Sequence, residues 1–122
     1  ARAALEAMAL QSMDVINTMA KDSGIELKEL RVDGGASANN LLMQIQSDVT
    51  DLDIVRPEIV ETTAQGAAFL AGLAVGYWED MEEIKSIWKV DKKFSPSGKD
   101  ISQLKHNWAR AVERAKAWVE EE

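Results

Sequence analysis

The sequence contains no cysteine and only one histidine, His106. Without cysteine the chain forms no disulfide bond, no thiolate metal site and no cysteine nucleophile. A single histidine does not provide a histidine metal site, and His106 lies off the apolar stripe of its predicted helix, so we expect a solvated surface residue. The composition therefore predicts no metal centre, and it fits a reducing compartment, which we take to be the cytoplasm.

An excess of positive charge is also missing, because the 122 residues carry a formal net charge of −7. A nucleic-acid or anionic-membrane surface requires a basic face, so we expect neither partner. In residues 1–15 the apolar run is too short, and too interrupted by charged and amide groups, for a signal peptide or a membrane span. The chain opens inside a helical pattern without an initiator methionine, which predicts a fragment of a longer polypeptide.

No repeat, low-complexity tract or linker divides the chain, so we expect one domain that buries roughly two thirds of its unfolded surface. Residues 1–22 have apolar side chains at helical spacing, and Gly24 has the place of a left-handed residue that ends this helix. The predicted apolar stripe consists of Leu5, Met8, Ser12, Val15, Ile16 and Met19. We interpret Met8 and Met19 as core residues rather than as an adaptable binding groove.

Residues 30–40, LRVDGGASANN, form the most informative stretch. They predict a short strand, a tight turn at two glycines and the start of a helix. Adjacent glycines allow positive φ and leave no Cβ in the way of a ligand. A ligand of an open α/β sheet lies at the carboxyl ends of the strands, where helix N-termini offer free N–H groups. The pattern is neither a dinucleotide fingerprint nor a P-loop, and a glycine pair after a strand is more often plain turn chemistry.

Two polar residues of this stretch have alternative interpretations. Asp33 has the place of a general base or a magnesium ligand, but no second acidic residue or histidine lies nearby in sequence. We therefore favour a structural carboxylate that accepts backbone N–H bonds around the turn. The Asn39 amide is able either to cap the next helix or to contact a base or ribose, because asparagine both donates and accepts. From its position alone, capping is the better interpretation.

After the glycine pair the chain continues to alternate helix and strand. Residues 53–56 predict a short strand, because Pro57 forces the residue before it into an extended conformation. The helix before this strand has a predicted apolar face of Ala38, Leu41, Leu42, Ile45, Val49 and Leu52, with Gln44, Gln46 and Asp48 largely off it. The order helix, strand, helix, strand, helix with a further C-terminal helix places the chain in the α/β class.

Capping-box spacing marks three further helix starts, at Thr62 with Gln65, Asp80 with Glu83, and Asp100 with Gln103. The first of these helices contains glycines at 66, 72 and 76, which cost a helix about 1 kcal/mol each relative to alanine. We expect them to permit the close approach of another backbone. Residues 89–94 predict an edge strand, and residues 95–98 predict a turn.

The last predicted helix carries two tryptophans, Trp108 and Trp118, near an apolar stripe that continues to Val119. We interpret both as anchors that dock this helix, because no basic residues are arranged beside them for a phosphate backbone. Residues Glu120 to Glu122 predict a frayed end.

The segments RVDGGASANNLLMQIQSD and RPEIVETTAQGAAFLAGLAVGYW resemble the closing part of the FGGY carbohydrate kinases, in the actin-like ATPase superfamily. The resemblance covers nearly the whole chain, and its most specific pieces favour the members that phosphorylate glycerol over the sugar kinases. It implies a partial ribonuclease H-like, actin-like ATPase fold, with residues 1–122 as the C-terminal part of the second, nucleotide-binding domain. It also implies that the helix after Thr62 sits against the central sheet.

The resemblance assigns a site as well. The glycine turn resembles the family's adenosine-binding motif, so Gly35 and Asn39 are expected to contact ATP or ADP, with Gly34 and Ala36 shaping the turn. An ATP-dependent kinase that uses Mg²⁺ is implied. The family's catalytic aspartate, acceptor-binding residues and phosphate-binding loops have no counterpart here. We therefore expect no catalytic residue and no magnesium ligand in this segment, and no activity from the segment alone.

The expected partners are the nucleotide, glycerol in the full-length enzyme and the rest of the parent chain. Uncovered apolar surface on the helix that contains Gly66 to Gly76 also predicts self-association, and we expect a homo-oligomer. Two rival functions stay open at this point. One is another FGGY sugar kinase, and the other is a nucleotide-binding or interaction module without catalysis.

Overall fold

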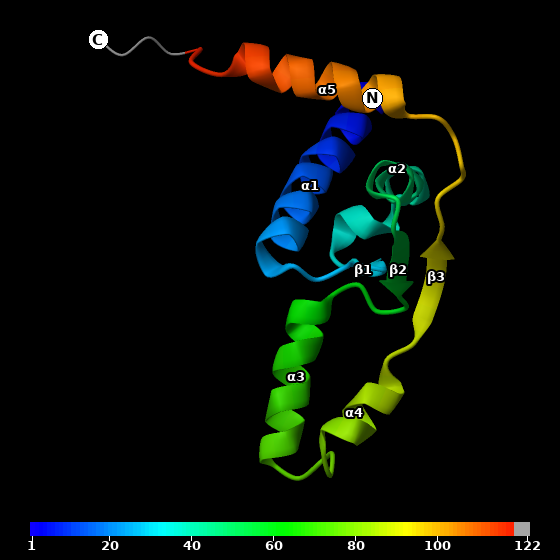
Figure 1. The fold of residues 1–122 in the computed structure, drawn as a ribbon. Helices are drawn as coiled ribbons and strands as arrows, with labels where there is room; N and C mark the ends of the chain where they lie inside the picture. The colour runs from blue at the N-terminus through cyan, green and yellow to red at the C-terminus, as the bar shows by residue number, and fades with distance from the viewer. Residues whose placement is uncertain (119–122) are drawn as a thin grey trace.

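The computed structural model describes residues 1–118, so the predictions for Val119 and for Glu120 to Glu122 lie outside the described residues (Figure 1). The elements, in order, are α1 (Arg2–Ser23), β1 (Glu29–Arg31), the 3-10 helix η1 (Gly35–Ala38), α2 (Asn40–Thr50), β2 (Asp53–Pro57), α3 (Thr62–Ala74), α4 (Met81–Ile87), β3 (Val90–Phe94) and α5 (Ser102–Ala115). The α/β class and the alternation of helices and strands are confirmed. Among these helices none is long and apolar enough to cross a membrane.

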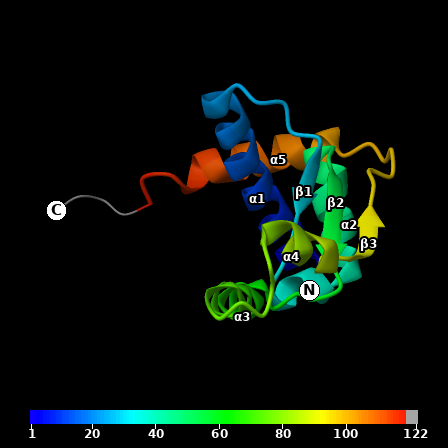
Figure 2. The same cartoon turned by 90° about the horizontal axis from the view of Figure 1, so that it is seen from below.

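The three described strands form one mixed sheet in the order β1-β2-β3, and they lie next to one another in Figure 2. β1 and β2 are parallel, and η1 and α2 provide the crossover that parallel neighbours need. β3 is antiparallel to β2 and forms an edge, as residues 89–94 predict. The carboxyl ends of β1 and β2 therefore lie at the same end of the sheet, and the glycine turn follows directly from β1.

The core lies where α1 and α2 pack together over the sheet. Its buried members are Ala9, Leu10, Met13, Leu42, Met43, Ile45, Val49, Ile54 and Phe94. The predicted stripe of α1 is wrong in part, because Met8, Val15 and Met19 are about half exposed or more. Apolar side chains surround this helix on several sides, so periodicity alone did not identify the face that meets α2. In α2 the prediction fails at Leu41, which is 52% exposed.

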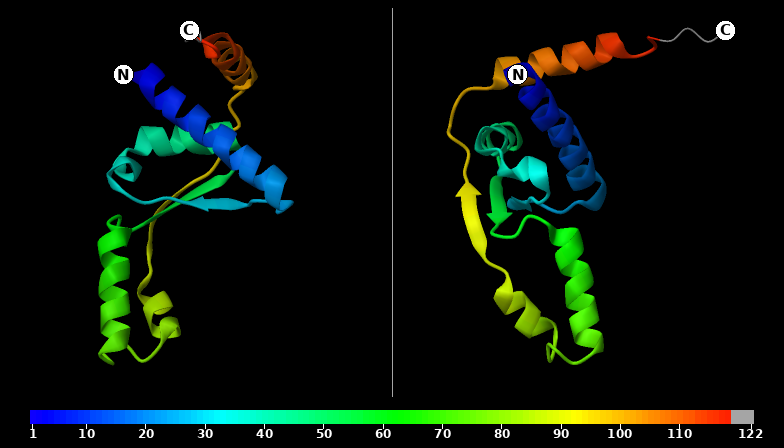
Figure 3. Two further views of the ribbon diagram at one scale, coloured as in Figure 1. Left: turned by 90° about the vertical axis from the view of Figure 1, so that its left-hand side faces the viewer. Right: turned by 180° about the vertical axis from the view of Figure 1, so that it is seen from behind.

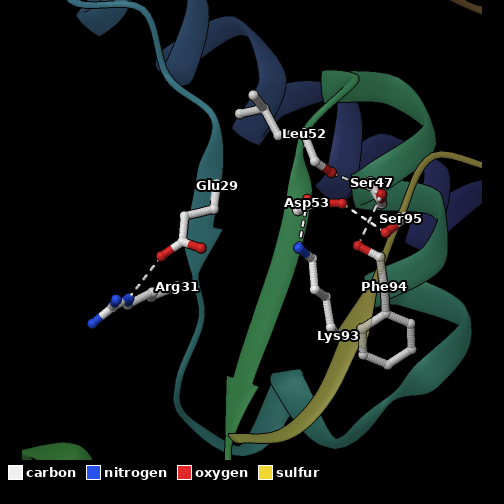
Figure 4. Close-up of polar contacts among 8 residues, drawn as sticks. All are labelled: Glu29, Arg31, Ser47, Leu52, Asp53, Lys93, Phe94 and Ser95. Carbon is white, nitrogen blue, oxygen red and sulfur yellow. Dashed lines mark hydrogen bonds and ion pairs between the residues drawn. The ribbon is translucent and has the colours of Figure 1, made fainter.

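Two polar side chains of α2 are buried, although the sequence placed Gln46 largely off the apolar face and made no prediction for Ser47. Gln46 is 5% exposed, and its Nε2 donates to the carbonyl oxygen of Ala9 at 3.3 Å. The hydroxyl of Ser47 is fully buried and lies 2.8 Å from the carbonyl oxygen of Leu52 and 3.3 Å from that of Phe94 (Figure 4). These contacts tie α2 to α1 and to the neighbouring strands, because buried polar groups need partners.

An exposed ion pair joins β2 to β3 beside this serine (Figure 4). Lys93 Nζ lies 2.7 Å from Asp53 Oδ2, and the Ser95 hydroxyl donates to Asp53 Oδ1 at 2.6 Å. The hydrogen bonds from Lys93 and then Ser95 lower the pKa of Asp53, and the bond to Asp53 raises the pKa of Lys93. Arg31 and Glu29 form a further exposed pair on β1, with 3.1 Å between Nε and Oε1.

Residues 62–87, called here the α3–α4 hairpin, extend away from α1, α2 and α5 (Figure 3). α3 does not cover the sheet within the described residues, so the expectation that it sits against the sheet is wrong for this structure. Leu70, Val75 and Tyr77 are 69%, 82% and 76% exposed. The hairpin therefore presents the uncovered apolar surface that the sequence predicts.

The glycines of α3 have different roles from those predicted. A Cβ added at Gly72 would lie 2.0 Å from the ring of Trp78, so Gly72 accommodates an aromatic side chain rather than another backbone. A Cβ at Gly66 would meet nothing within 4 Å. Gly76 lies after the helix, with a φ of 72°. Trp78 also packs edge-on against Phe69, with ring centroids 5.1 Å apart.

The capping predictions succeed at one helix, fail in part at a second and fail completely at the third. Asp80 Oδ1 accepts from the N–H groups of Glu82 and Glu83 at the start of α4. Asp100 accepts from the N–H of Ser102, and hydrogen bonds from the backbone and then the side chain of Ser102 lower its pKa, while Gln103 donates to Asn107. Thr62 caps nothing: the first-turn cap position of α3 is Glu61, without a side-chain bond.

The C-terminal helix is held by one of its two predicted anchors. Trp108 packs against the core, and its Nε1 donates to Asp14 Oδ2 at 2.7 Å. Trp118 is 86% exposed, so its prediction as an anchor is wrong. His106 is exposed, as predicted. Residues 95–100, predicted to begin with a turn, form an irregular connection with Gly98 at a φ of 74°.

Candidate functional site

The chain leaves β1 and turns at Gly34 into η1. Gly34 has φ 75° and ψ 168°, a conformation that glycine adopts readily and other residues rarely adopt. Its N–H donates to Val60 O at 2.8 Å, and its carbonyl oxygen accepts from the N–H and the hydroxyl of Ser37 at 3.0 and 2.7 Å. Ser37 is 2% exposed. The turn is therefore closed by its own hydrogen bonds, and Gly34 is required for its shape.

Gly35 is different from Gly34, although the sequence predicted positive φ for the pair. Its φ is not positive, and a Cβ added there would meet nothing within 4 Å. Neither the backbone conformation nor packing within residues 1–118 requires glycine at this position. The N–H groups of Gly35 and Ala36 also have no acceptor in this part of the chain. Open space and free donors lie together where a ligand would approach the backbone.

Asn39 caps α2, which confirms the interpretation drawn from its position. Its Oδ1 accepts from the N–H of Leu41 at 3.0 Å and from that of Leu42 at 3.1 Å. Such a cap satisfies two of the free donors at a helix start. The side chain is exposed, and its Nδ2 donates to no group among the described residues. Contact between this amide and a nucleotide stays a prediction.

Asp33 has a structural partner, although a different one from that predicted. Its Oδ2 accepts from the hydroxyl of Thr62 rather than from backbone N–H groups of the turn. Thr62 is the first residue of α3. The bond therefore connects the end of β1 to the start of α3, which explains why Thr62 does not act in a capping box.

Sequence reasoning missed the best-buried charged group near the turn, Arg56 of β2. It is 9% exposed. Its Nη1 donates to Ser37 O at 2.8 Å and to Asn40 Oδ1 at 3.0 Å, while Nε donates to Asp91 Oδ2 at 2.8 Å. An arginine at the end of a β-branched run was the available signal, but nothing in the sequence shows which groups it meets.

Two pockets open beside the turn. The larger, of about 210 Å³, includes Ala36, and its lining is Met8, Ser12, Leu30, Val32, Asp33, Ala36, Ser37, Leu42, Met43 and Gln46. The smaller, of about 160 Å³, is lined by Arg31, Val32, Asp33, Pro57, Thr62 and Trp88. Each is below the roughly 300 Å³ at which small-molecule sites begin. The described residues contain no group of three or more acidic or histidine side chains placed to hold a metal ion.

Residues 1–75 match the model of the C-terminal domain of the FGGY family of carbohydrate kinases. The chain belongs to this family. The matched residues run from α1 through α3 and include the whole glycine turn. The resemblance noted in the sequence is therefore confirmed, and the residues predicted to contact a nucleotide lie within the part of the chain that the FGGY model covers.

Comparison with individual FGGY proteins gives similarity over almost the full chain. It is 58% identical to the glycerol kinase of Burkholderia vietnamiensis over 99% of the chain, and 56% identical to that of Paraburkholderia phytofirmans over 98%. These matches cover 25% and 24% of the two relatives. The chain thus spans about a quarter of the length of the curated relatives it matches.

Similarity to solved structures also extends over almost the full chain. The crystal structure of Plasmodium falciparum glycerol kinase with ADP superposes with a TM-score of 0.79 and 36% identity, over 97% of this chain and 24% of that one. A ligand-bound xylulose kinase from Lactobacillus acidophilus gives 0.76 and 22% identity, over 95% and 24%. At that lower identity the likeness concerns the fold alone.

Proposed function

We propose that the chain is part of an ATP-dependent glycerol kinase and that its glycine turn contributes to binding the adenosine end of ATP or ADP. The activity is supported by the 58% and 56% identity to glycerol kinases over nearly the whole chain. Nucleotide binding is supported by the neighbour from Plasmodium falciparum, whose crystal structure holds ADP. In this proposal residues 1–122 are the C-terminal part of the second, nucleotide-binding domain of a two-domain kinase.

The observation that carries the site is the contrast at the glycine pair. Position 34 requires glycine because its φ is positive. Position 35 has a φ that other residues also adopt, and a Cβ there would enter open space. Such a glycine beside two backbone N–H groups that have no acceptor among residues 1–118 is explained by a ligand that lies against the backbone. Asn39 is the second proposed contact, through its Nδ2, and Ala36 shapes the turn and lines the larger pocket.

Within this kinase the chain has a positioning role. Transfer of the γ-phosphoryl group to a glycerol hydroxyl depends chiefly on aligning the two substrates and on neutralising charge. The turn would hold the adenosine end, so that the phosphates extend toward groups contributed by other parts of the enzyme. Magnesium accompanies ATP, and we assign neither a magnesium ligand nor a catalytic residue to this chain.

The rest of the parent kinase is the proposed partner of the uncovered α3 surface, where Leu70 and Val75 are largely exposed. Self-association into a homo-oligomer is the second proposed assembly, because exposed apolar patches favour association. A cytoplasmic location is part of the proposal, since ATP is the proposed substrate and the sequence contains no cysteine.

The test is Gly35→Val in the full-length kinase, with ADP affinity measured by calorimetry. A branched side chain would occupy the open space at Gly35, so we expect a loss of ADP affinity of at least about tenfold. Ser97→Ala is the control, because Ser97 lies on the irregular connection beyond β3, and this variant should bind ADP normally. If Gly35→Val lowered thermal stability and left the ADP dissociation constant unchanged, the glycine pair would be structural only.

A further inference from the structure

Arg56 is a charged side chain that the fold itself buries and satisfies. Its side chain is 11% exposed, against 45% for that of Asp91. A buried charge is costly unless its donors are paired. Nε, Nη1 and Nη2 of Arg56 each have a partner, and the Nη2 atom lies 2.6 Å from Asp91 Oδ2. The planar guanidinium is therefore held in one orientation.

The contacts made by Nη1 converge on the glycine turn. Ser37, whose carbonyl oxygen accepts from it, belongs to the four-residue η1 that begins at Gly35. Asn40, whose Oδ1 accepts from it, is the first residue of α2. Asn39 lies between these two acceptors in the chain. Nη1 of Arg56 thus binds the backbone of Ser37, which precedes Asn39, and the side chain of Asn40, which follows it.

The Nε and Nη2 atoms of the guanidinium contact Asp91, which lies at an irregularity in the pairing of β2 with β3. Arg56 faces Lys92 across the strand pair and Pro57 faces Val90, so Asp91 is the extra residue of a β-bulge. Bulges change the direction of a side chain relative to regular alternation. The Asp91 carboxylate accepts from Nε of Arg56 at 2.8 Å. β3 therefore supplies a fixed anion that orients the arginine toward η1.

We propose that Arg56, oriented by Asp91, is a positioning residue for the nucleotide site. It holds η1 and the start of α2 so that the Gly35 backbone and the Asn39 amide meet the adenosine end together. This inference rests on the proposed function of the turn. Lysine would not replace arginine here, because one ammonium group on a flexible stem does not reproduce a fork that bonds three groups in fixed directions.

The inference makes a kinetic prediction that a general stabilising role does not make. In the full-length kinase, Arg56→Lys should raise the KM for ATP and the dissociation constant of ADP about tenfold, since hydrogen bonds to a charged group are lost. The kcat should change by less than about twofold, and the KM for glycerol should not change, because only nucleotide placement is affected.

The experiment compares three full-length variants with the wild type, using steady-state kinetics, ADP calorimetry and thermal unfolding. Arg56→Lys removes the fork, and Asp91→Asn is the milder change, which removes the orienting charge and keeps an oxygen acceptor. Asp53→Asn is the matched control, because it breaks the other ion pair between β2 and β3, and Asp53 is the first residue of β2, at the end of the strand opposite to the glycine turn. We expect the ADP constant to rise for the first two variants and to stay within about twofold for the control.

Each outcome decides something. Lower thermal stability with an unchanged ADP constant in Arg56→Lys and Asp91→Asn would overturn the inference, because Arg56 would then be structural only. If Arg56→Lys does not fold, Asp91→Asn decides by the same criterion. Loss of ADP binding in Gly35→Val alone would uphold the proposed site and reject the role of Arg56. An unchanged ADP constant in Gly35→Val would reject the site and, with it, the positioning role.

Discussion

The part of the molecule built from α1, α2 and the sheet differs from the α3–α4 hairpin in how its side chains are held. In the first part, nine apolar residues are buried in one cluster, and Gln46, Ser47 and Arg56 reach carbonyl or side-chain acceptors on other elements. In the hairpin, residues 62–87, the buried residues are Gly72 and Ile84 alone. The candidate site is thus supported by the part with internal contacts, whereas the hairpin presents a surface for something else to cover.

The largest expected effect separates a core residue from a hairpin residue. Ile54 is fully buried, so Ile54→Ala should lower the free energy of unfolding by about 2–5 kcal/mol through lost burial and the cavity left behind. Leu70 is 69% exposed, so Leu70→Ala should change the free energy by less than about 0.5 kcal/mol. Urea unfolding of the chain measures both values.

The same two variants can be compared in the full-length kinase. If the rest of the parent chain covers α3, Leu70→Ala should be clearly more destabilising in the full-length protein than in the chain alone. Equal destabilisation by Ile54→Ala and Leu70→Ala in the chain alone would show that the hairpin is already packed in solution.

The next effect compares two glycines with positive φ, Gly34 in the turn and Gly76 after α3. Both have free space for a Cβ, so alanine at either position costs about 1–3 kcal/mol in backbone strain. Gly34→Ala should lower the free energy of global unfolding, because its turn connects β1 to α2. Gly76→Ala should instead speed hydrogen exchange within the hairpin only, since weakly packed units open locally. Global destabilisation by both variants would contradict a separable hairpin.

The two helix caps Asn39 and Asp80 can be compared by both stability and ADP affinity. Asn39 caps α2 and Asp80 caps α4, so alanine at either position should cost the chain about 1 kcal/mol of helix stability. In the full-length kinase, Asn39→Ala should also weaken ADP binding several-fold, because one amide hydrogen bond is worth on the order of 1 kcal/mol. Asp80→Ala should leave ADP binding unchanged. Equal ADP affinity in both variants would limit Asn39 to capping.

The smallest expected effect concerns the pH dependence of the pair Asp53 and Lys93. The folded-state pKa of Asp53 lies below its ordinary value of 3.8, so the pair stabilises the fold above that pH and loses its effect as the pH falls through the lower, folded value. The wild type and Asp53→Asn should therefore differ in stability at neutral pH and converge in acid. Urea titrations at several pH values measure this, and a difference that persisted well below pH 3.8 would contradict it.

The sequence predicted those features that depend on neighbouring residues. Gly24 ends α1 in a left-handed conformation, Asn39 and Asp80 cap their helices, and the strand predicted at residues 53–56 forms and includes one further residue, Pro57. Each of these depends on residues within a few positions, and local rules describe such cases well. The family followed from longer motifs that are specific enough to identify it.

The failures occurred where a distant element determines the environment of a side chain. Met13 rather than Met8 is buried, because Met13 lies in the core cluster that α1 shares with α2. Gln46 and Arg56 are buried because each meets acceptors from segments far away in sequence, Ala9 for one and Ser37 for the other. Hydrophobic periodicity contains no information about such acceptors, so polar residues of this kind were assigned to the surface or overlooked.

The bond between Trp108 and Asp14 joins residues 94 positions apart, and it has a consequence for the order of folding. The packing of α1 on α2 and the pairing of β1 with β2 close much shorter loops. Loop closure costs more entropy as the loop lengthens, so contacts of low sequence separation form first. α5 should therefore dock after the sheet has formed, so the burial of Trp108 would mark a late step of folding rather than the first.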